Sequence, residues 1–417
     1  MDKATSSHAV RATSPKTVRV LMVVRLFFPW VGGMERQAHK LALALKARDI
    51  DVKIATGWWF WQTRRKESID GIPVFRNFTL WECFRIKGLR KFGGYLYIAC
   101  LMFHLWRRRA EYDLIHVHGL SYHTFAAVLM GRWLGRPVVV KLANSGPASD
   151  IAKMRSGQHL ALSRYLLPTA LRADRFVALN RLIVRELVEA GVPAAQIEEI
   201  PNGVPTAGVA PKASYSLHHP ARLLFVGRLH PQKGLDVLLK ALRRLQDEGT
   251  EVGLTLVGDG PQKTQLEDLA LALGIRTQVT FAGESSHVPD YLREADVFVL
   301  PSRAEGVSNS LLEAMAQGLP VVVSDIPGNA EVVDDEKTGF LFRLDDVSSL
   351  AARLQSLLRD QTLRQAIGDA ARREIGGRYA IGRIAERYIG VYQGLLSRGA
   401  HPQTDRGRLR RGLAYPN

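Results

Sequence analysis

The segment DVFVLPSRAEGVSNSLLEAMAQGLPVVVS, residues 296–324, decides the fold class of this chain. It begins with the apolar run 296–300, passes through a polar loop, and continues as a helix that is expected to start near Ser308 or Asn309. Gly318 then stops the helix, and a second apolar run follows. A strand, a helix and another strand in this order are typical of a parallel sheet, so the segment predicts an α/β fold.

The alternation of short β-branched runs and helical segments continues on both sides of this segment. In the first half of the chain we expect strands over 18–24, 52–55, 114–118, 137–142 and 175–178. In the second half we expect strands over 222–226, 253–257, 278–281, 296–300, 320–324 and 339–342. Repeated units of this kind build parallel sheets, and a chain of 417 residues suits two such domains.

Composition suggests where these parts begin and end. The segment 201–220 is rich in Pro, Ala, Ser and His and has no periodicity, which indicates a connection between domains. The expected parts, in chain order, are a disordered N-terminal tail over 1–17, a first domain over 18–207, a linker over 208–220, a second domain over 221–380, a helix over 381–398 that packs back toward the first domain, and a disordered basic tail over 399–417.

The chain is strongly basic. Its 57 Lys and Arg residues against 40 Asp and Glu residues give a formal net charge of +17. Such an excess suits nucleic acid, an anionic membrane or anionic substrates. The sequence has no zinc-finger or RNA-recognition motif, so we expect anionic lipid headgroups and a phosphorylated substrate as partners, and no nucleic acid. A basic surface that only keeps the protein soluble is the alternative.

The cysteines and the apolar runs indicate the compartment. Cys83 and Cys100 do not form a C-x-x-C pair, which argues against a disulfide framework or a cysteine-based metal site and fits the reducing cytosol. The apolar run 95–106 is too short to span a bilayer, and we interpret it as a buried helix of the first domain. The polar N-terminus does not resemble a secretory signal. We therefore expect a cytoplasmic protein that is peripheral on the inner face of the membrane.

Two glutamates bracket the loop that leads from the strand of the opening segment into its helix. Ser308, Asn309 and Ser310 suit the start of this helix, where unpaired backbone N–H groups and the helix dipole favour an anion. Glu305 lies at the carboxyl end of a strand, where open α/β sheets bind ligands, and Glu313 lies one turn inside the helix. Carboxylates suit the hydroxyls of a sugar or ribose. The alternatives are a solvated helix face for Glu313 and a charge favoured by the dipole for Glu305.

A second cluster, GRLHPQKG at 227–234, follows the expected strand 222–226. Arg228 and Lys233 are two cations five residues apart, and such a pair can neutralise the two phosphates of a diphosphate. Negative charge grows on a diphosphate as it leaves, so these cations would act mainly in the transition state. A solvated basic loop is the alternative.

Together, GRLHPQKG at 227–234 and EGVSNSLLEAMAQGLPVV at 305–322 resemble family 4 of the retaining glycosyltransferases, and the resemblance extends over residues 18–397. It implies an α/β fold of the GT-B type, with two Rossmann-like domains whose parallel sheets face a central cleft. The first domain would bind the acceptor and the second the nucleotide-sugar. The resemblance also implies that no catalytic metal and no cofactor takes part, because the nucleotide-sugar is the co-substrate.

The resemblance further implies roles for individual residues. Glu305 and Glu313 match the family's E-x7-E motif, so that Glu305 would face the transferred sugar and Glu313 the ribose. Arg228 and Lys233 would hold the diphosphate. The expected catalytic residues are Glu305, His118, Arg228 and Lys233, with His118 on the sugar hydroxyls or, alternatively, a structural cap of its strand. The expected donor-binding residues are Gly32, Gly33, Gly227, Asp259, Gly260, Ser308, Asn309, Ser310, Leu312 and Glu313.

Residues of the first half suggest where an acceptor binds. Trp58 and Trp59 lie beside a run of cations and are expected to be exposed, as tryptophans are at membrane interfaces and sugar-stacking sites. Lys141 and Asn144 lie near the end of a strand, where the family often has a His-Gly pair that this chain lacks. These four residues are the expected acceptor contacts. Asn202 precedes a glycine, and we interpret it as ordinary turn chemistry.

These observations predict a retaining glycosyltransferase that moves a hexose-type sugar from a nucleotide diphosphate donor. A UDP-sugar is favoured and a GDP-sugar is the second choice, and the acceptor would be lipid-linked, a polysaccharide or a small molecule at the membrane. One alternative is a nucleotide-sugar epimerase or a phosphorylase on the same scaffold. The other is a non-catalytic basic protein that binds a membrane or nucleic acid, which the charge of +17 motivates.

Overall fold

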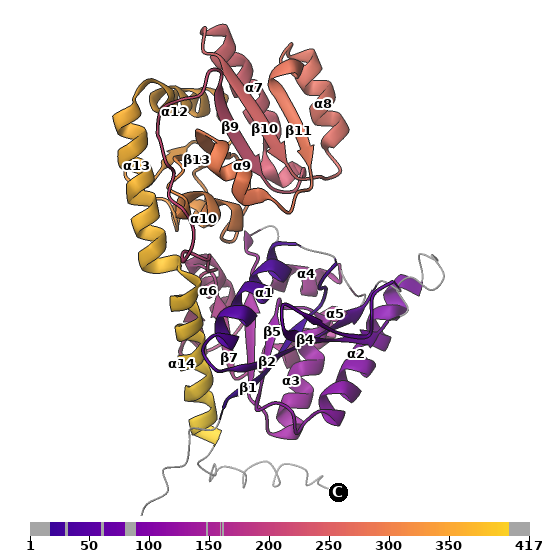
Figure 1. Cartoon of the computed structure of the whole chain (residues 1–417). Coiled ribbons are helices and arrows are strands. Elements are labelled where there is room, and N and C mark those ends of the chain that lie inside the picture. Colours follow the sequence, from indigo (N-terminus) through magenta and orange to yellow (C-terminus); the bar gives the residue numbers. More distant parts are fainter. Residues whose placement is uncertain are drawn as a thin grey trace, which may run out of the picture.

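The computed structural model describes residues 17–29, 32–59, 62–79, 89–146, 149–158, 160 and 162–399 of the chain. These residues form two α/β domains, each built on one central sheet (Figure 1). The structure therefore confirms the predicted α/β fold with two sheets of mainly parallel strands. The expected tails fall almost entirely on residues 1–16 and 400–417, which lie outside the described residues.

The first sheet has the strand order β3-β4-β2-β1-β5-β6-β7-β8, and every neighbouring pair except β3 and β4 is parallel. The strands are β1 (Arg19–Val24), β2 (Asp51–Trp58), β3 (Lys66–Ile69), β4 (Ile72–Phe78), β5 (Leu114–His118), β6 (Val138–Leu142), β7 (Arg175–Ala178) and β8 (Ile197–Glu199). The β3–β4 hairpin and β8 are not among the expected strands. The hairpin turns at Asp70 and Gly71, whose φ angles of 48° and 75° suit a two-residue hairpin turn.

The second sheet is parallel throughout, with the order β11-β10-β9-β12-β13-β14. Its strands are β9 (Ala221–Val226), β10 (Val252–Val257), β11 (Val279–Gly283), β12 (Val297–Leu300), β13 (Val321–Ser324) and β14 (Phe340–Phe342). All six expected strands of this half are present. Because all their carboxyl ends lie at one edge, the loops that follow β9, β10 and β12 are brought together there.

Helices pack on both sheets (Figure 1). The first domain has α1 (Gly33–Lys46), α2 (Leu89–Arg107), α3 (Tyr122–Leu134), α4 (Asp150–Ser156), α5 (Ser163–Ala170) and α6 (Arg181–Glu189). The remaining helices are α7 (Leu235–Asp247), α8 (Lys263–Ala272), α9 (Val288–Glu294), α10 (Asn309–Ala316), α11 (Pro327–Ala330), α12 (Val347–Arg359), α13 (Gln361–Glu374) and α14 (Ile381–Gly399). Within the described part of the chain, none of the helices combines the length and hydrophobicity needed to cross a bilayer.

The last helix links the two domains. After α13, α14 runs along the first domain and packs on α1 (Figure 1). Tyr388 and Tyr392 of α14 are fully buried, and the Tyr392 hydroxyl lies 2.8 Å from Nδ1 of His116 on β5. Helix α14 therefore forms part of the core of the first domain.

Candidate functional site

Two loops at the carboxyl edge of the second sheet are joined by hydrogen bonds. The loop 227–234 follows β9, and the loop 301–308 follows β12. Arg303 donates its backbone N–H to the Gln232 carbonyl at 2.7 Å, and Gln232 Nε2 donates to the Ala304 carbonyl at 2.7 Å. The two clusters that the sequence analysis singled out separately therefore form one surface.

Lys233 and Glu305 meet where these loops join. Lys233 Nζ contacts Glu305 Oε1, and Ser302 Oγ donates to the same oxygen at 2.7 Å. The two side chains are 18% and 11% exposed, so water screens this pair less than it screens a surface ion pair. Gly234, with a φ of 63°, allows the close approach, because a Cβ there would lie 2.1 Å from the Pro301 carbonyl oxygen. The structure thus brings an expected phosphate-binding cation and the expected sugar-facing carboxylate into contact.

Arg303 fixes the position of the second loop. Its guanidinium contacts Asp236 at 2.9 Å and Asp345 at 2.8 Å, and it donates to the Pro231 carbonyl at 2.9 Å. The hydrogen bond to Asp236 raises the pKa of Arg303. Because these partners occupy its donors, Arg303 holds the loop in place rather than offering its charge to a ligand.

The loop after β9 also interlocks with the loop after β10. Leu229 donates its N–H to the Asp259 carbonyl at 2.9 Å, and a Cβ on Gly260 would lie 2.2 Å from the Leu229 carbonyl oxygen. Gly227 and Arg228 lie directly before this contact. Arg228 is exposed and makes no hydrogen bond or ion pair with any residue that the structure describes. Its guanidinium is therefore available to an anion, in contrast to that of Arg303.

Helix α10 begins beside the same surface. Ser308 is its N-cap residue, but the Ser308 hydroxyl lies 3.2 Å from that of Ser310 and caps no backbone N–H. The first N–H groups of the helix thus have no side-chain cap, and such groups attract an anion. Leu312 is fully buried, so only its backbone is left for a ligand.

Asn309 connects the start of α10 to the first domain. Its Nδ2 donates to the Gly33 carbonyl at 2.9 Å, and its Oδ1 accepts from Gln37 Nε2 at 2.9 Å and from Asn202 Nδ2 at 3.1 Å. Gly33 is the first residue of α1. The expected glycine loop and the expected helix start therefore lie together. The interpretation of Asn202 as ordinary turn chemistry is wrong, because its side chain links the two domains.

Two further contacts involve groups that were expected to face the donor. Lys40 Nζ on α1 lies 2.5 Å from Glu313 Oε1 on α10, and both side chains are about one-fifth exposed. The Gly32 N–H is donated to Glu35 Oε2 at 2.9 Å. A ligand that uses Glu313 or the Gly32 amide must compete with these partners.

Comparison with known proteins gives the family. The family model described as "Glycosyl transferases group 1" matches residues 212–374, and the model described as "Glycosyltransferase Family 4" matches residues 31–207. The glycogen synthase of Mycobacterium tuberculosis is 30% identical over 395 aligned residues, which cover 90% of this chain and 94% of that protein. The chain belongs to the family 4 glycosyltransferases. The resemblance inferred from the two motifs is thereby confirmed.

Two other proteins extend the comparison. The GDP-mannose-dependent alpha-(1-6)-phosphatidylinositol monomannoside mannosyltransferase of Mycolicibacterium smegmatis is 30% identical over 278 residues, covering 61% of this glycosyltransferase and 72% of that enzyme. The crystal structure of Anabaena HepE in complex with UDP-glucose has a TM-score of 0.71 and 20% sequence identity, and it covers 90% of this chain and 99% of that chain. This likeness confirms the GT-B fold of the glycosyltransferase.

His118 and Lys141 of the glycosyltransferase are buried. The His118 ring is fully buried, 4.3 Å from the ring of His116, and neither of its nitrogens has a hydrogen-bond partner in the described part of the chain. Burial lowers the pKa of His118 well below its usual range. Lys141 is also buried, donates to Asn202 Oδ1 at 3.0 Å, and has a pKa that burial lowers to about 7. Tyr388 of α14 packs against His116 and Lys141, and the expected ligand contacts of His118 and Lys141 stay predictions.

The tryptophans are not exposed as expected. Trp59 is buried, its Nε1 donates to the Arg25 carbonyl at 2.6 Å, and its ring packs 5.5 Å from that of Tyr97 on α2. Trp58 ends β2 and is half-buried, and its Nε1 donates to the Thr63 carbonyl at 2.9 Å. The prediction of an exposed tryptophan pair is therefore wrong, because the first tryptophan continues the strand and the second reaches the core.

Asn144 lies close to the proposed donor loop. Its Nδ2 donates to Asp150 Oδ1 at 2.8 Å. The carbonyl oxygen of the preceding residue, Ala143, would lie 2.2 Å from a Cβ on Gly306, the neighbour of Glu305. The loop after β6 thus approaches the loop after β12, which keeps Asn144 a candidate acceptor contact.

Several residues of this surface were missed by the sequence analysis. Gln37 and Lys40 follow Gly33 by four and seven residues, the spacing of one helix face, and both reach α10. This periodicity is a signal that could have identified them. Arg303 had no comparable signal, because its partners lie 67 and 42 residues away in the chain.

Proposed function

We propose that this glycosyltransferase moves a hexose-type sugar from a nucleotide diphosphate donor to a membrane-associated acceptor, with retention of configuration. The observation that carries the proposal is the contact of Lys233 with Glu305 beside the exposed Arg228 and the start of α10. Two cations and a set of uncapped helix N–H groups suit a diphosphate, and the neighbouring carboxylate suits the hydroxyls of the sugar.

The proposed roles follow from the charges. A bound diphosphate would form ion pairs with Lys233 and Arg228. Lys233 would then give up its contact with Glu305, and the Glu305 carboxylate could accept hydrogen bonds from the sugar hydroxyls. As the bond between the anomeric carbon and the diphosphate oxygen breaks, the two cations and the start of α10 stabilise the growing negative charge. The acceptor oxygen forms its bond to the anomeric carbon on the same face, and its proton passes to the leaving phosphate oxygen. Because protein cations take the charge, we propose that the reaction needs no metal.

We propose a UDP-sugar as the donor, with a GDP-sugar as the second choice. The UDP-glucose complex of HepE supports the first, and the name of the mannosyltransferase of M. smegmatis supports the second. Glu313 lies one turn inside α10 and would exchange Lys40 for the ribose hydroxyls. The base itself would lie near the loop after β10, which carries Asp259 and Gly260.

We propose an acceptor that is lipid-linked, a polysaccharide or a small molecule, reached from the inner face of the membrane. The names of the two curated relatives, a glycogen synthase and a phosphatidylinositol monomannoside mannosyltransferase, support this range. The net charge of +17 favours an anionic surface. Phe103 and Trp106 on α2 are 57% and 41% exposed, as residues that reach an interface are.

The test is a panel of nucleotide-sugars scored by thermal stabilisation and by sugar release in the presence and absence of EDTA. A bound donor at 100 times its Kd adds about 2.7 kcal/mol to the stability of the protein. We expect one donor to stabilise the wild type, to stabilise Lys233→Ala less, and to turn over equally with EDTA. An epimer formed without acceptor would instead support the epimerase. Binding of RNA or DNA with no response to any nucleotide-sugar would contradict the proposal.

A further inference from the structure

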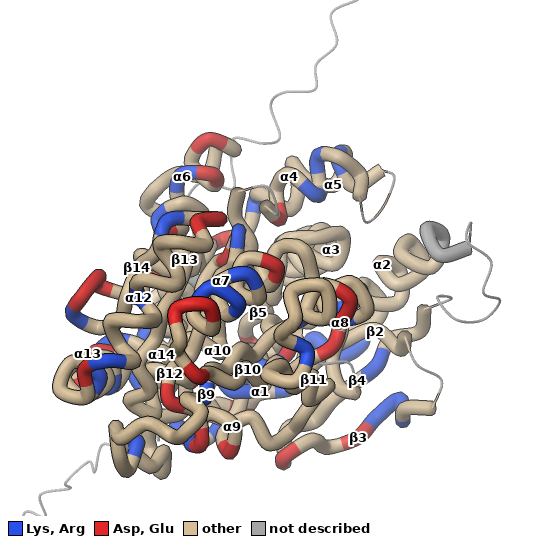
Figure 2. The backbone as a smooth tube through the Cα atoms, turned by 90° about the horizontal axis from the view of Figure 1, so that it is seen from above, with Lys and Arg blue, Asp and Glu red and all other residues tan. Residues whose placement is uncertain are grey.

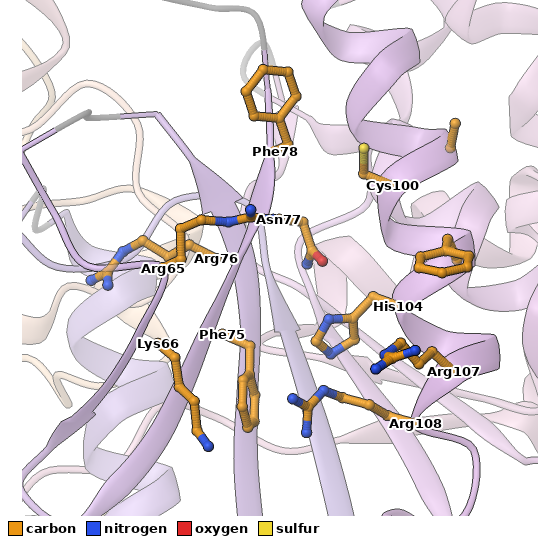
Figure 3. Close-up of a pocket in the computed structure, with 12 residues that line it drawn as sticks. Arg65, Lys66, Phe75, Arg76, Asn77, Phe78, Cys100, His104, Arg107 and Arg108 are labelled. Atoms are coloured by element: carbon orange, nitrogen blue, oxygen red, sulfur yellow. The ribbon is translucent and has the colours of Figure 1, made fainter.

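Basic residues are spread over both domains and interspersed with acidic ones (Figure 2), but one cavity gathers several of them. The cavity has a volume of about 530 Å³ and lies in the first domain, between the β3–β4 hairpin and α2 (Figure 3). Of the described residues, five cations and no carboxylate line it. They are Arg65, Lys66 and Arg76 on the hairpin side and Arg107 and Arg108 on α2.

Three of these five charges have no counter-ion among the residues that the structure describes. Arg76 pairs with Glu67 at 2.5 Å, and Arg108 pairs with Glu111 at 2.8 Å. Arg65, Lys66 and Arg107 make no ion pair with any residue in the described part of the chain. Like charges that converge on a cavity raise the free energy of the folded protein unless an anion joins them. Among the described residues, the cavity therefore carries an excess of about three positive charges that no carboxylate balances.

An aromatic floor holds two of the cations in place. Phe75 of β4 is buried, the Arg108 guanidinium lies 3.9 Å from the centre of its ring, and Lys66 Nζ lies 5.8 Å from it. The two cations flank the ring in Figure 3. Cation–π contacts of this kind fix the charge without neutralising it. Preformed positions reduce the ordering cost when a ligand binds.

His104 adds a polar group that has no hydrogen-bond partner among the described residues. Its Nε2 is buried and makes no hydrogen bond with any described residue, and its ring lies 5.7 Å from that of Phe75. Burial, with a further contribution from Arg108, lowers the pKa of His104 to about 4, so the ring is neutral at pH 7. A neutral imidazole offers one N–H donor and one acceptor. Figure 3 shows the ring among the cavity residues, between Asn77 and Arg108.

We propose that this cavity binds the phosphate group of a ligand, either a phospholipid headgroup or a free phosphorylated molecule. Arg forks and Lys ammonium groups are the side chains that bind phosphate, and the volume lies in the range of small-ligand sites. The site is distinct from the donor surface, which lies on the loops after β9 and β12. The exposed Phe103 lines the same cavity and would contact the apolar part of a lipid.

The test uses Cys100, a half-buried free thiol that lines the cavity. In a Cys83→Ser background, alkylation by N-ethylmaleimide reports on Cys100 alone. Burial raises the pKa of the Cys100 thiol, and Arg65 opposes this, so an anion at Arg65 would slow alkylation by its charge as well as by its bulk. We expect inorganic pyrophosphate to slow the reaction about tenfold at ten times its Kd, because only the unoccupied fraction then reacts.

Matched variants locate the effect. The triple variant Arg65→Ala, Lys66→Ala, Arg107→Ala should lose the protection by pyrophosphate. The control Lys240→Ala, Arg359→Ala, Arg373→Ala removes the same charge from exposed residues of the second domain and should keep it. Lys233→Ala should also keep it, which separates this site from the proposed donor site. If the triple variant fails to fold, Arg107→Gln alone at the exposed end of α2 should weaken the protection.

Two further arms identify the source of the phosphate. Protection by phosphatidylcholine vesicles that contain phosphatidylglycerol, but not by phosphatidylcholine alone, would assign the site to a lipid headgroup. Protection by pyrophosphate without protection by either vesicle would assign it to a free phosphorylated ligand. The proposal is overturned if no anion slows the alkylation of Cys100, or if the triple variant is protected as well as the wild type.

Discussion

On the second domain, Arg228, Lys233 and Glu305 lie on loops that begin where strands end, whereas on the first domain His118 and Lys141 lie within strands. The loops are joined to each other by short hydrogen bonds and keep an exposed cation. Lys141 instead lies beside Tyr388 of α14, and the His118 ring packs against His116, which Tyr388 and Tyr392 cover. The Arg228 side chain on the loops is therefore available to a ligand, whereas the side chains of His118 and Lys141 on the strands are part of the core.

The largest expected effect is on the loop side of this comparison. Replacing Glu305 by Gln keeps the shape of the side chain and removes its charge. We expect kcat to fall by at least about 100-fold, the usual cost of losing one group that stabilises a transition state, while the nucleotide diphosphate still binds. Steady-state transfer kinetics and calorimetry measure the two effects. Glu251→Gln, at an exposed carboxylate of the same domain, is the control and should transfer normally.

A substitution of Asn309 tests whether transfer requires the hydrogen bonds that join the start of α10 to the first domain. Asn309→Ala removes hydrogen bonds to Gly33, Gln37 and Asn202. We expect transfer to fall about 10- to 100-fold and the free energy of unfolding to fall by about 1–3 kcal/mol, because buried partners lose their hydrogen bonds. Urea denaturation and transfer assays check this. Wild-type activity in Asn309→Ala, matching that of a Gln265→Ala control at an exposed amide on α8, would show that the bridge does not matter.

A substitution of His118 tests whether this strand residue is buried, because burial of a histidine makes the stability of the protein depend on pH. Its pKa in the folded protein lies well below 6.5 because the ring is buried, so below pH 6.5 the unfolded chain binds a proton that the folded chain does not. Stability is then lost as pH falls, by about 1.4 kcal/mol per pH unit for this one group. His118→Phe should remove that part of the slope between pH 6.5 and 5. Parallel curves for wild type and variant would mean that His118 is accessible to water.

The smallest expected effect is that of Lys40, which pairs across the two domains with Glu313. Lys40→Ala would free Glu313, so we expect the affinity for the nucleotide diphosphate to rise by up to about fivefold, in line with about 1 kcal/mol for a partly exposed ion pair. Calorimetric titration on wild type, each single variant and the double variant with Glu313→Ala isolates the coupling. A lower affinity in Lys40→Ala would instead mean that Lys40 itself contacts the donor.

The same contrast explains what could be predicted from the sequence. Glu305 and Lys233 follow strands directly, and parallel strands end at a common edge, so their meeting could be expected. The burial of His116, against which the His118 ring packs, could not, because it depends on Tyr388 and Tyr392 of α14 packing onto β5.

Trp59 illustrates a second limit. A tryptophan beside arginines resembles an interfacial residue. However, β2 extends three residues beyond its expected end, to Trp58, and the ring of Trp59 packs against Tyr97 of α2. Gln37 and Lys40 are the opposite case, because they were missed although their helical spacing from Gly33 could have identified the face of α1 that contacts α10. A pattern within one element can therefore identify such residues, whereas contacts between distant elements leave no pattern of this kind.

The central claim is that the loops after β9 and β12 hold the donor diphosphate, and calorimetric titration with UDP and GDP tests it most directly. We predict that the wild type binds at least one of them and that Lys233→Ala binds it about 10- to 100-fold more weakly, because a charge-assisted hydrogen bond is lost and Glu305 is left facing the phosphates. Lys240→Ala, at an exposed lysine on α7, should bind like the wild type. Equal affinity in Lys233→Ala and the wild type, or no binding of either nucleotide, would contradict the claim.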